Sequence, residues 1–589
     1  MHSITRTPNR FRIYSAPIFF PILVVSVAWL TFAARPSTAQ DLNRIRDQLK
    51  KPIPQSAPKV VDWFLDQHVA AASSDASLHK VMALNTDRIL AVGDRGLVLL
   101  SQDAGRSWQQ PSTGTSMNLY GTAAADEMNL WVVGGKIQPQ SEMSIGVVLH
   151  SQDSGRTWKA IAGGNIPRLT GIAVVGNSSL IAWGDYSPSL GSSLFESRDG
   201  GATWQGMPSQ LGHIQAAARD AAGRFLAVDR AGQALLIPHS ANELPDQIAE
   251  PTRPVQGAEF IAGKWMVFGD HGTLAASSDG SLWTDVPLPL SPRARAVFSF
   301  RSCAQFGDHV WLAGYPGSVM LHSADRGATW KTIATPGNWP IQSLTFADSD
   351  RGWAVTEGGS IWATRDGGVT WFAQRLVARR LGLLAIAGSY ENIPWQALAE
   401  SVAESQQTAA VKVLHRQRLE ESASLLPEMN VAVESAGAQI GLVAAVTDSA
   451  FPIPDRRLQG TSSVRDYYRT QSISDRKLSP LLSDDLVVAL RCYRPSVVMT
   501  DNPNPTGPVA GAVINAVSSA VDVASQSSSD LKWMEDELKL TPWKILKLVI
   551  RTDDKGSPVQ AHARSVAGDA GTEYRGHPNA DLRFDRQQR

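Results

Sequence analysis

Carboxylates recur through the first two thirds of this chain at two kinds of position, and each position suggests a different role. Three acids, Asp94, Asp185 and Asp270, come directly after short apolar segments. Two carboxylates that face each other across a cleft can act as the acid and the base of a glycoside hydrolase, so these three are candidate catalytic groups. The same Gly-Asp pattern is common in ordinary turns, so a structural interpretation stays open.

Six further acids lie in copies of one turn, Ser/Thr-x-Asp-x-Gly-x-Ser/Thr-Trp, of which one copy is a residue shorter. In such a turn the carboxylate accepts N–H bonds, the glycine takes a positive φ, and the tryptophan pins the turn to a neighbour. A carboxylate bonded to its own turn is not available for acid–base catalysis, so we interpret the motif as structural. Its residues are Asp103, Asp153, Asp199, Asp279, Asp325, Asp366, Trp108, Trp158, Trp204, Trp283, Trp330 and Trp371.

A second repeated phrase gives the number of units. Short apolar segments begin at seven places that lie 40 to 50 residues apart: Ile89, Trp131, Ile181, Phe225, Trp265, Trp311 and Trp353. Four short strands in a unit of this length are typical of a propeller blade. The sequence therefore predicts an all-β, seven-bladed propeller over residues 60–378. The fourth blade, from Phe225 to about Pro251, lacks the Asp turn.

The six turns resemble the Asp-box, or BNR, repeats of sialidases and sortilin-type receptors. The blade phrase Gly-x-Val-Leu-x-Ser-x-Asp-x-Gly-x-Thr-Trp is most similar to propellers of the photosystem II assembly and stability factor type. This resemblance covers residues 60–378 and implies the propeller architecture. It implies little about function, because the Asp box is a structural device in every family that carries it.

The N-terminus has the pattern of a secretory signal. Arg6, Arg10 and Arg12 precede an apolar run from Ile13 to Phe32, and small residues lead up to Ala39. We expect residues 1–39 to be a signal peptide, residues 40–59 to be a linker, and the mature chain to be periplasmic, extracellular or on the cell surface, with no stable membrane insertion after cleavage. If the signal is not cleaved, the same apolar run can anchor the chain in a membrane.

Composition excludes two further classes. Lys plus Arg equals Asp plus Glu, at 55 each, so there is no electrostatic argument for a nucleic-acid partner. Only two cysteines are present, Cys303 and Cys492, in different predicted domains, which excludes a disulfide scaffold.

After Arg375 the pattern changes to short apolar strands that alternate with helices. This alternation predicts an α/β, Rossmann-like domain with a parallel sheet over residues 380–552, followed by a disordered tail at 553–589. Strands are expected at 381–387, 410–414, 440–446 and 496–500, and helices at 395–407, 417–436, 484–492 and 508–524.

This second region resembles the PIG-L or LmbE-like family of zinc-dependent N-acetylglucosaminyl deacetylases. The resemblance rests on Leu383-Leu-Ala-Ile-Ala, on Leu490-Arg-Cys-Tyr-Arg-Pro-Ser-Val-Val-Met-Thr-Asp501, and on Leu538-Lys-Leu-Thr-Pro-Trp543. It implies the deacetylase fold, with a zinc site formed by residues that follow the strands of the first two motifs.

The zinc motifs of that family are broken here. Where the family has a histidine ligand and a general base, this chain has Gly388 and Tyr390, and only Glu391 is left to coordinate. Where the family has its last histidine ligand, this chain has Ala510. A hydrolytic zinc needs three protein ligands, so we expect no metal and no cofactor, and a degenerate pocket around Tyr390, Glu391 and Asp501.

Two functions follow from these observations. The first is an exported, non-catalytic binding or assembly protein, in which the propeller loops hold a protein or glycan partner and the second domain is a pseudoenzyme. The alternative is a secreted carbohydrate-active hydrolase that works through blade-end carboxylates or through the remodelled pocket. A bound zinc ion would favour the hydrolase.

Overall fold

The computed structural model describes most of the predicted propeller and part of the predicted second domain. The described residues are 76–137, 143–207, 212–237, 246–247, 255–376, 381–387, 409–413, 478–500, 508–552 and 560–565, apart from the single positions 164, 177, 230, 231 and 233. All of them belong to one compact unit, Phe64–Arg589. The expected signal peptide and linker lie outside the described residues.

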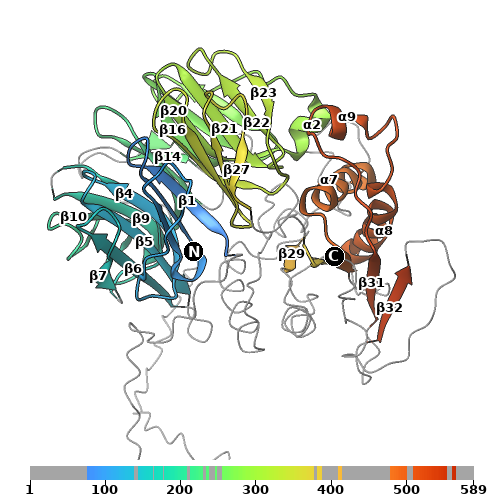
Figure 1. The fold of residues 1–589 in the computed structure, drawn as a ribbon, viewed down its shortest axis with the longest axis horizontal. Helices are drawn as coiled ribbons and strands as arrows, with labels where there is room; N and C mark the ends of the chain where they lie inside the picture. The colour runs from blue at the N-terminus through green and yellow to red at the C-terminus, as the bar shows by residue number, and fades with distance from the viewer. Residues whose placement is uncertain are drawn as a thin grey trace, which may run out of the picture. The chain divides into compact units, whose positions relative to one another are not determined.

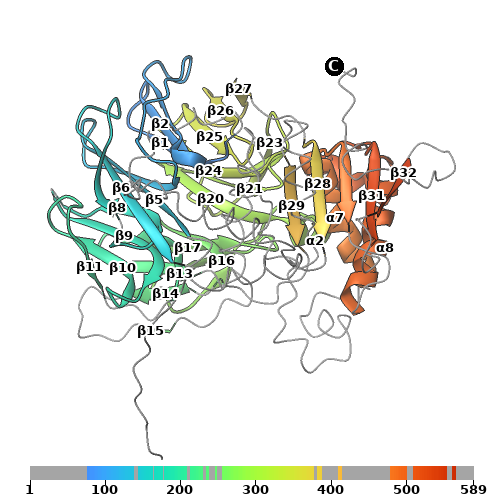
Figure 2. The same ribbon diagram turned by 90° about the horizontal axis from the view of Figure 1, so that it is seen from below.

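Seven antiparallel sheets follow one another along the chain and form the blades of a propeller (Figures 1 and 2). Blade 1 consists of β1 Leu78–Ala83, β2 Ile89–Gly93 and β3 Val98–Ser101. Blade 2 consists of β4 Asn118–Ala124, β5 Leu130–Ile137, β6 Ser144–Ser151 and β7 Lys159–Gly163. Blade 3 consists of β8 Leu169–Val174, β9 Leu180–Ser187, β10 Ser192–Ser197 and β11 Gln205–Gly206. A 3-10 turn, η1 Asp94–Gly96, joins β2 to β3. In blade 1 the fourth strand is reduced to one bridge between Leu100 and Gln109.

The remaining blades have four strands each. Blade 4 consists of β12 Ile214–Arg219, β13 Phe225–Asp229, β14 Ala234–Ile237 and β15 Asp246–Gln247, and blade 5 of β16 Val255–Ile261, β17 Lys264–Gly269, β18 Leu274–Ser277 and β19 Thr284–Asp285. Blade 6 consists of β20 Ser299–Phe306, β21 His309–Tyr315, β22 Val319–Ser323 and β23 Lys331–Ala334. Blade 7 consists of β24 Ile341–Phe346, β25 Gly352–Thr356, β26 Ile361–Thr364 and β27 Phe372–Arg375. The predicted seven-bladed propeller is therefore confirmed, and blade 4 forms without an Asp box.

Each pair of neighbouring blades shares one hydrophobic cluster. The cluster between blades 2 and 3 joins Val148 to Phe195, and the cluster between blades 7 and 1 joins Trp353 to Leu78. The second of these closes the ring. Among the described residues every blade is made of consecutive strands, so the contact between the first and last blades is made by side-chain packing.

Side-chain hydrogen bonds reinforce this closure. In blade 1 the N–H groups of Val81 and Ala83 donate to Ser343 Oγ at 3.3 Å and Thr345 Oγ1 at 3.2 Å in blade 7. Gln374 Nε2 donates to the carbonyl oxygen of Ala104 at 2.7 Å. These bonds run between the inner strands and between the outer turns, so the first and last blades are held along their whole width.

The box tryptophans pack into the cluster between their own blade and the preceding one. Three of them, Trp204, Trp330 and Trp371, are each 9% exposed and donate from Nε1 to a box glycine carbonyl at 3.0–3.1 Å. The other three are partly buried, and their Nε1 atoms have no hydrogen-bond partner: Trp108, Trp158 and Trp283. The expected wedge between blades is thus tightest in blades 3, 6 and 7.

The C-terminal region forms a five-stranded sheet in the order β29-β28-β30-β31-β32 (Figure 2). The strands are β28 Leu383–Ala387, β29 Ala409–Val413, β30 Val497–Thr500, β31 Lys547–Thr552 and β32 Gln560–Ser565, and the helices are α7 Leu478–Tyr493, α8 Pro508–Ala524 and α9 Lys532–Asp536. Neighbouring strands run parallel, except that β32 is antiparallel to β31. A mainly parallel sheet with helices is therefore present.

One expectation for this region is wrong. Residues 560–565 fall inside the predicted disordered tail, yet they form β32, which pairs with β31 from Lys547 to Thr552. Backbone hydrogen bonding at the sheet edge forms this strand despite its polar sequence. The helices expected at 395–407 and 417–436 and the strand expected at 440–446 lie outside the described residues.

In the part of the chain that the structure describes, no helix is long and apolar enough to cross a membrane.

We expect Trp204→Ala to lower the free energy of unfolding by about 3–5 kcal/mol, because the cavity lies between two blades that cannot easily collapse onto it. Trp158→Ala should cost about 2 kcal/mol, because the Trp158 indole is only partly buried. Urea denaturation of the purified protein measures both values. Arg198→Ala is the matched control, since this exposed side chain lies in the same turn as Trp204. Equal losses for Trp204→Ala and Arg198→Ala would contradict the packing role.

Candidate binding site at one end of the propeller

The strand register places the two kinds of acid at opposite ends of the blades. In blade 1, Leu78 at the start of β1 pairs with Gly93 at the end of β2, so these two residues share one end. Ser101 at the end of β3 pairs with Ile89 at the start of β2, so the Asp box that follows Ser101 lies at the other end. We call these the mouth end and the box end of the propeller.

At the box end, the Asp side chains are hydrogen-bonded within their own turns. Asp153 Oδ1 accepts from Ser151 Oγ at 2.8 Å and from the Thr157 N–H at 2.9 Å, while Oδ2 accepts from Thr157 Oγ1 at 2.6 Å. Gly155 takes a φ of 83° and donates to Ser151 Oγ at 2.8 Å. The hydrogen bonds from the Thr157 side chain and backbone lower the pKa of Asp153 to about 2. A carboxylate held in this way stays ionised and bonded at neutral pH.

The same bonds recur in the other boxes. In four of them the Asp accepts from the hydroxyl two residues before it and from the Ser or Thr four residues after it: Asp103, Asp199, Asp325 and Asp366. In the shortened copy, Asp279 Oδ1 accepts from the N–H groups of Ser281 and Leu282 at 2.8 and 3.1 Å. All six sequence-predicted Asp residues therefore lie in the turn geometry that the motif requires.

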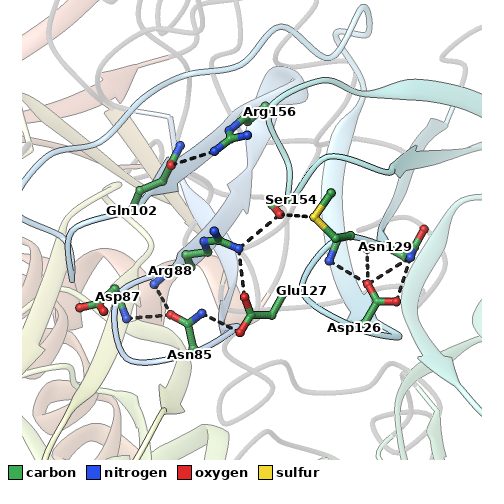
Figure 3. A network of polar contacts seen from close by, with 10 residues as sticks. Asn85, Asp87, Arg88, Gln102, Asp126, Glu127, Asn129, Ser154 and Arg156 are labelled. Atoms are coloured by element: carbon green, nitrogen blue, oxygen red, sulfur yellow. Dashed lines mark hydrogen bonds and ion pairs between the residues drawn. The ribbon is translucent and has the colours of Figure 1, made fainter.

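Exposed polar contacts also link neighbouring blades at the box end. Arg88 in blade 1 forms an ion pair with Glu127 in blade 2 at 3.0 Å, and Asn85 Nδ2 donates to the other Glu127 oxygen at 2.9 Å (Figure 3). Arg156 Nη2 reaches Gln102 Oε1 at 3.4 Å (Figure 3). Because these groups are solvent-exposed, each pair contributes little stability.

At the mouth end, every blade presents one half-buried side chain from a bulge. In all seven first strands the register shifts by one residue close to the strand start, which leaves one residue without a direct partner on the second strand. The bulged residues are His79, Tyr120, Thr170, Gln215, Gln256, Arg301 and Gln342. All seven carry a polar group. The first strands surround the central channel of a propeller, so these residues form a polar ring around one mouth of that channel.

The candidate catalytic acids lie next to this ring. Asp94 Oδ1 is 2.7 Å from His79 Nε2. Asp270 accepts from Gln256 Nε2 at 3.0 Å and from Ser299 Oγ at 2.6 Å. Each acid thus has a partner from the ring or from the start of the next blade.

Asp185 is the most strongly held of the three acids. Its side chain is 3% exposed, and Arg168 binds it through two bonds, Nη2 to Oδ1 at 2.9 Å and Nε to Oδ2 at 3.1 Å. His213 Nδ1 lies 3.5 Å from Oδ1, and Ser144 Oγ donates to Oδ2 at 2.7 Å. Burial alone would raise the pKa of Asp185, but the charge of Arg168 and the hydrogen bonds outweigh burial and lower the pKa. This carboxylate is therefore an ionised anchor and a poor proton donor.

Blade 7 contributes an acid that the sequence analysis missed. Glu357 follows β25 in the same way that Asp94 follows β2, and it lies 3.6 Å from the ring residue Arg301. The signal that could have found it is positional, because Glu357 comes one residue after the strand Gly352–Thr356.

The described residues contain no cluster of three or more His, Cys, Asp or Glu side chains that could hold a metal ion. The degenerate-pocket residues Tyr390, Glu391 and Asp501 lie outside the described residues, as does Gly388. Ala510 lies in α8.

Comparison with known proteins shows what part of the propeller is similar to. Residues 258–407 match the family described as photosynthesis system II assembly factor YCF48. Over these residues the chain is Ycf48-like. The chain is 29% identical over 177 residues to the photosystem II assembly protein Ycf48 of Synechococcus sp. (strain JA-3-3Ab), a match that covers 28% of this chain and 52% of that protein. It thus spans about half the length of the first curated relative.

Other relatives of the Ycf48-like propeller are more distant. The chloroplastic photosystem II stability/assembly factor HCF136 of Arabidopsis thaliana is 26% identical over 110 residues, covering 18% of this chain and 27% of that protein. Among solved structures, YCF48 from Cyanidioschyzon merolae is 20% identical with a TM-score of 0.40, over 50% of this chain and 96% of that one. A structure described as YCF48 bound to D1 peptide is 18% identical with a TM-score of 0.40, over 49% and 93%.

We expect the Ycf48-like propeller to lose stability as the pH falls from about 4 to about 2. The pKa of Asp153 is about 2 in the folded state and 3.8 ordinarily, so its stabilising effect is complete above pH 4 and disappears as the carboxylate protonates. The melting temperature measured against pH should fall less steeply in Asp153→Asn, which cannot titrate. Identical slopes below pH 4 would show that the box carboxylate does not contribute.

We expect Arg168→Ala to cost about 3–5 kcal/mol of unfolding free energy, because it leaves the buried Asp185 carboxylate without its cation. The matched control is Arg88→Ala, which breaks the exposed pair with Glu127 and should cost under about 1 kcal/mol. Chemical denaturation of both variants gives the comparison. A loss for Arg168→Ala no larger than that for Arg88→Ala would contradict the anchoring role.

Proposed function

We propose that this chain is an exported, non-catalytic assembly protein that holds a protein partner at the mouth end of its propeller. The observation that carries the proposal is the polar ring of seven bulged residues at one end of a Ycf48-like propeller. The curated relatives of the propeller are described as photosystem II assembly proteins, which supports an assembly role. Export is supported by the signal-like N-terminus.

The two ends of the propeller differ in what they offer a partner. At the box end the recurring carboxylates bond to their own turns, as Asp153 does. At the mouth end, blades 2 and 3 have longer strands, such as β5 and β9 with 8 residues against 5 in β2. These strands carry or lead to Met143 and Tyr186, which are 56% and 43% exposed. Methionine and tyrosine are residue types that protein interfaces favour.

For the C-terminal region we propose a Rossmann-like fold of the deacetylase type that has lost its chemistry. The support is sequence-based: Gly388 and Ala510 stand where the resembled family has zinc ligands, and Tyr390 stands where it has a general base. A tyrosine phenol ordinarily has a pKa near 10, about six units above that of an aspartate, so a tyrosine at this position does not replace a carboxylate base at neutral pH. Glu391 and Asp501 follow β28 and β30 in sequence, and open α/β sheets tend to bind ligands beyond the carboxyl ends of such strands.

Site-specific photocrosslinking tests the partner site. A benzophenone amino acid replaces Tyr186 at the mouth end or Phe306 at the box end, where the native side chains are 43% and 40% exposed. In cells that naturally make the protein, we expect irradiation to give a discrete protein adduct from position 186 and none from position 306. Absence of an adduct at 186, or the same adducts at both positions, would overturn the proposed binding end.

Metal analysis and an activity assay test the pseudoenzyme. We expect the purified mature chain to contain no stoichiometric zinc and to release no acetate from N-acetylglucosaminides, because at most one of the family's ligand positions has a coordinating side chain. Zinc at one equivalent, or deacetylation that is abolished by Glu391→Ala, would make the hydrolase the better function.

A further inference from the structure

The C-terminal domain contacts the propeller at the mouth end. Asn338, in the segment that leads into β24, accepts a bond at its carbonyl oxygen from Cys492 Sγ at 2.8 Å, and its Nδ2 donates to the Arg491 carbonyl at 3.1 Å. Ser318, between β21 and β22, donates to the Leu538 carbonyl at 2.5 Å. Both propeller segments join strands at the mouth end, so the C-terminal domain lies against that end of blades 6 and 7.

One contact reaches the acids of the mouth directly. The Tyr493 hydroxyl, at the end of α7, donates to Glu357 Oε2 at 2.8 Å, and both side chains are buried. Glu357 is also the partner of the ring residue Arg301, at 3.6 Å. The chain's own C-terminal domain therefore engages the part of the mouth that blades 6 and 7 form.

The same contact also has an apolar part. A single hydrophobic cluster includes Phe298, Tyr315 and Trp339 from the propeller together with Leu490 and Tyr493 from α7. The Tyr493 ring lies edge-on to Trp339, with centroids 5.6 Å apart. Residues of this cluster lose much of their burial if the two domains separate, which makes separation costly.

Arg293 holds the rim of this contact. It lies in α2 Pro292–Val297, a short helix between blades 5 and 6, and its guanidinium binds Asp484 of α7 through Nε at 2.5 Å and Nη2 at 2.6 Å. Nη1 binds Asp530 at 2.7 Å, and the guanidinium lies 5.1 Å from the centroid of the Trp533 ring. The hydrogen bond to Asp484 raises the pKa of Arg293, so the cation persists at any physiological pH.

The local sequence explains why α2 forms there. Ser291 accepts from the Ala294 N–H at 3.2 Å as the N-cap, and Pro292 occupies the first turn, where its missing N–H costs nothing. The Ser291 N–H in turn donates to Glu537 Oε2 of the C-terminal domain at 2.8 Å. Among the described connections between blades, α2 is the one that is helical, and it lies where the C-terminal domain docks.

We propose that the C-terminal domain is a built-in cap, latched by Arg293 onto the mouth end of blades 5 to 7. Blades 1 to 4 are then the sector of the mouth that a second protein can reach. That consequence for partner access rests on the proposed function, whereas the latch itself does not. A role as a cap explains why the chain keeps an α/β domain in which the zinc ligands and the general base of the resembled deacetylase family are replaced.

The two native cysteines provide a direct test. Cys492 is fully buried at the contact between the domains, and Cys303 is buried inside blade 6. Iodoacetamide is added to the folded, full-length protein, and mass spectrometry follows the alkylation of each thiol separately. We expect Arg293→Ala to speed alkylation of Cys492 by about tenfold or more, because one partner of a partly buried charge pair has gone. Alkylation of Cys303 should not change.

Arg326→Ala is the matched control, because Arg326 forms an ion pair with Asp308 at 2.6 Å in blade 6, the blade that follows α2, but at the box end. It should change neither rate. Arg293→Lys, which keeps the charge and loses the two-bond geometry, should give an intermediate rate for Cys492. The proposal is overturned if Cys492 reacts equally fast in the wild type and in Arg293→Ala, or if Arg293→Ala accelerates both thiols together. Because the experiment needs no partner, its failure is distinguishable from a failure of the proposed binding function.

Discussion

Packing of each blade against the next is the interaction on which the rest of this structure depends. Among the described strands none is shared between blades 1 and 7, and the cluster of Trp353, Leu78 and their neighbours closes the ring through side chains. The box tryptophans serve this packing, since each inserts into the cluster with the preceding blade. Interiors of this density tolerate little loss of volume, which explains why the turn that places each tryptophan is repeated with so little variation.

The two ends of the ring follow from this arrangement. In the turn that places each tryptophan, the carboxylate accepts hydrogen bonds from a backbone N–H and a hydroxyl of the same turn, as Asp153 does from Thr157. The mouth end does not have to place a tryptophan. There each first strand bulges and presents a polar side chain beside the channel. The carboxylates that stabilise the turns and the polar side chains that we propose for recognition therefore lie at opposite ends of the same strands.

Periodic features were predictable from the sequence, and features that depend on distant contacts were not. The spacing of the apolar segments predicted seven blades, including blade 4 without its box, because a local period survives in the sequence. The helix α8 was expected at the residues where it lies, 508–524. The bulges, the role of Glu357 and the strand β32 were missed, since each depends on pairing with another strand or domain. The acids Asp94, Asp185 and Asp270 were correctly placed at blade ends, but their partners His79, Arg168 and Ser299 lie elsewhere in the sequence.

The cluster between blades 5 and 6 differs from the other blade contacts, because it continues into the C-terminal domain through α7. A core shared in this way makes the two domains one cooperative unit, in which the α/β domain covers the mouth end of blades 5 to 7. Differential scanning calorimetry of the full-length chain tests this most directly. The account predicts a single transition whose calorimetric enthalpy equals its van't Hoff enthalpy. Two resolved transitions, one for each domain, would contradict it.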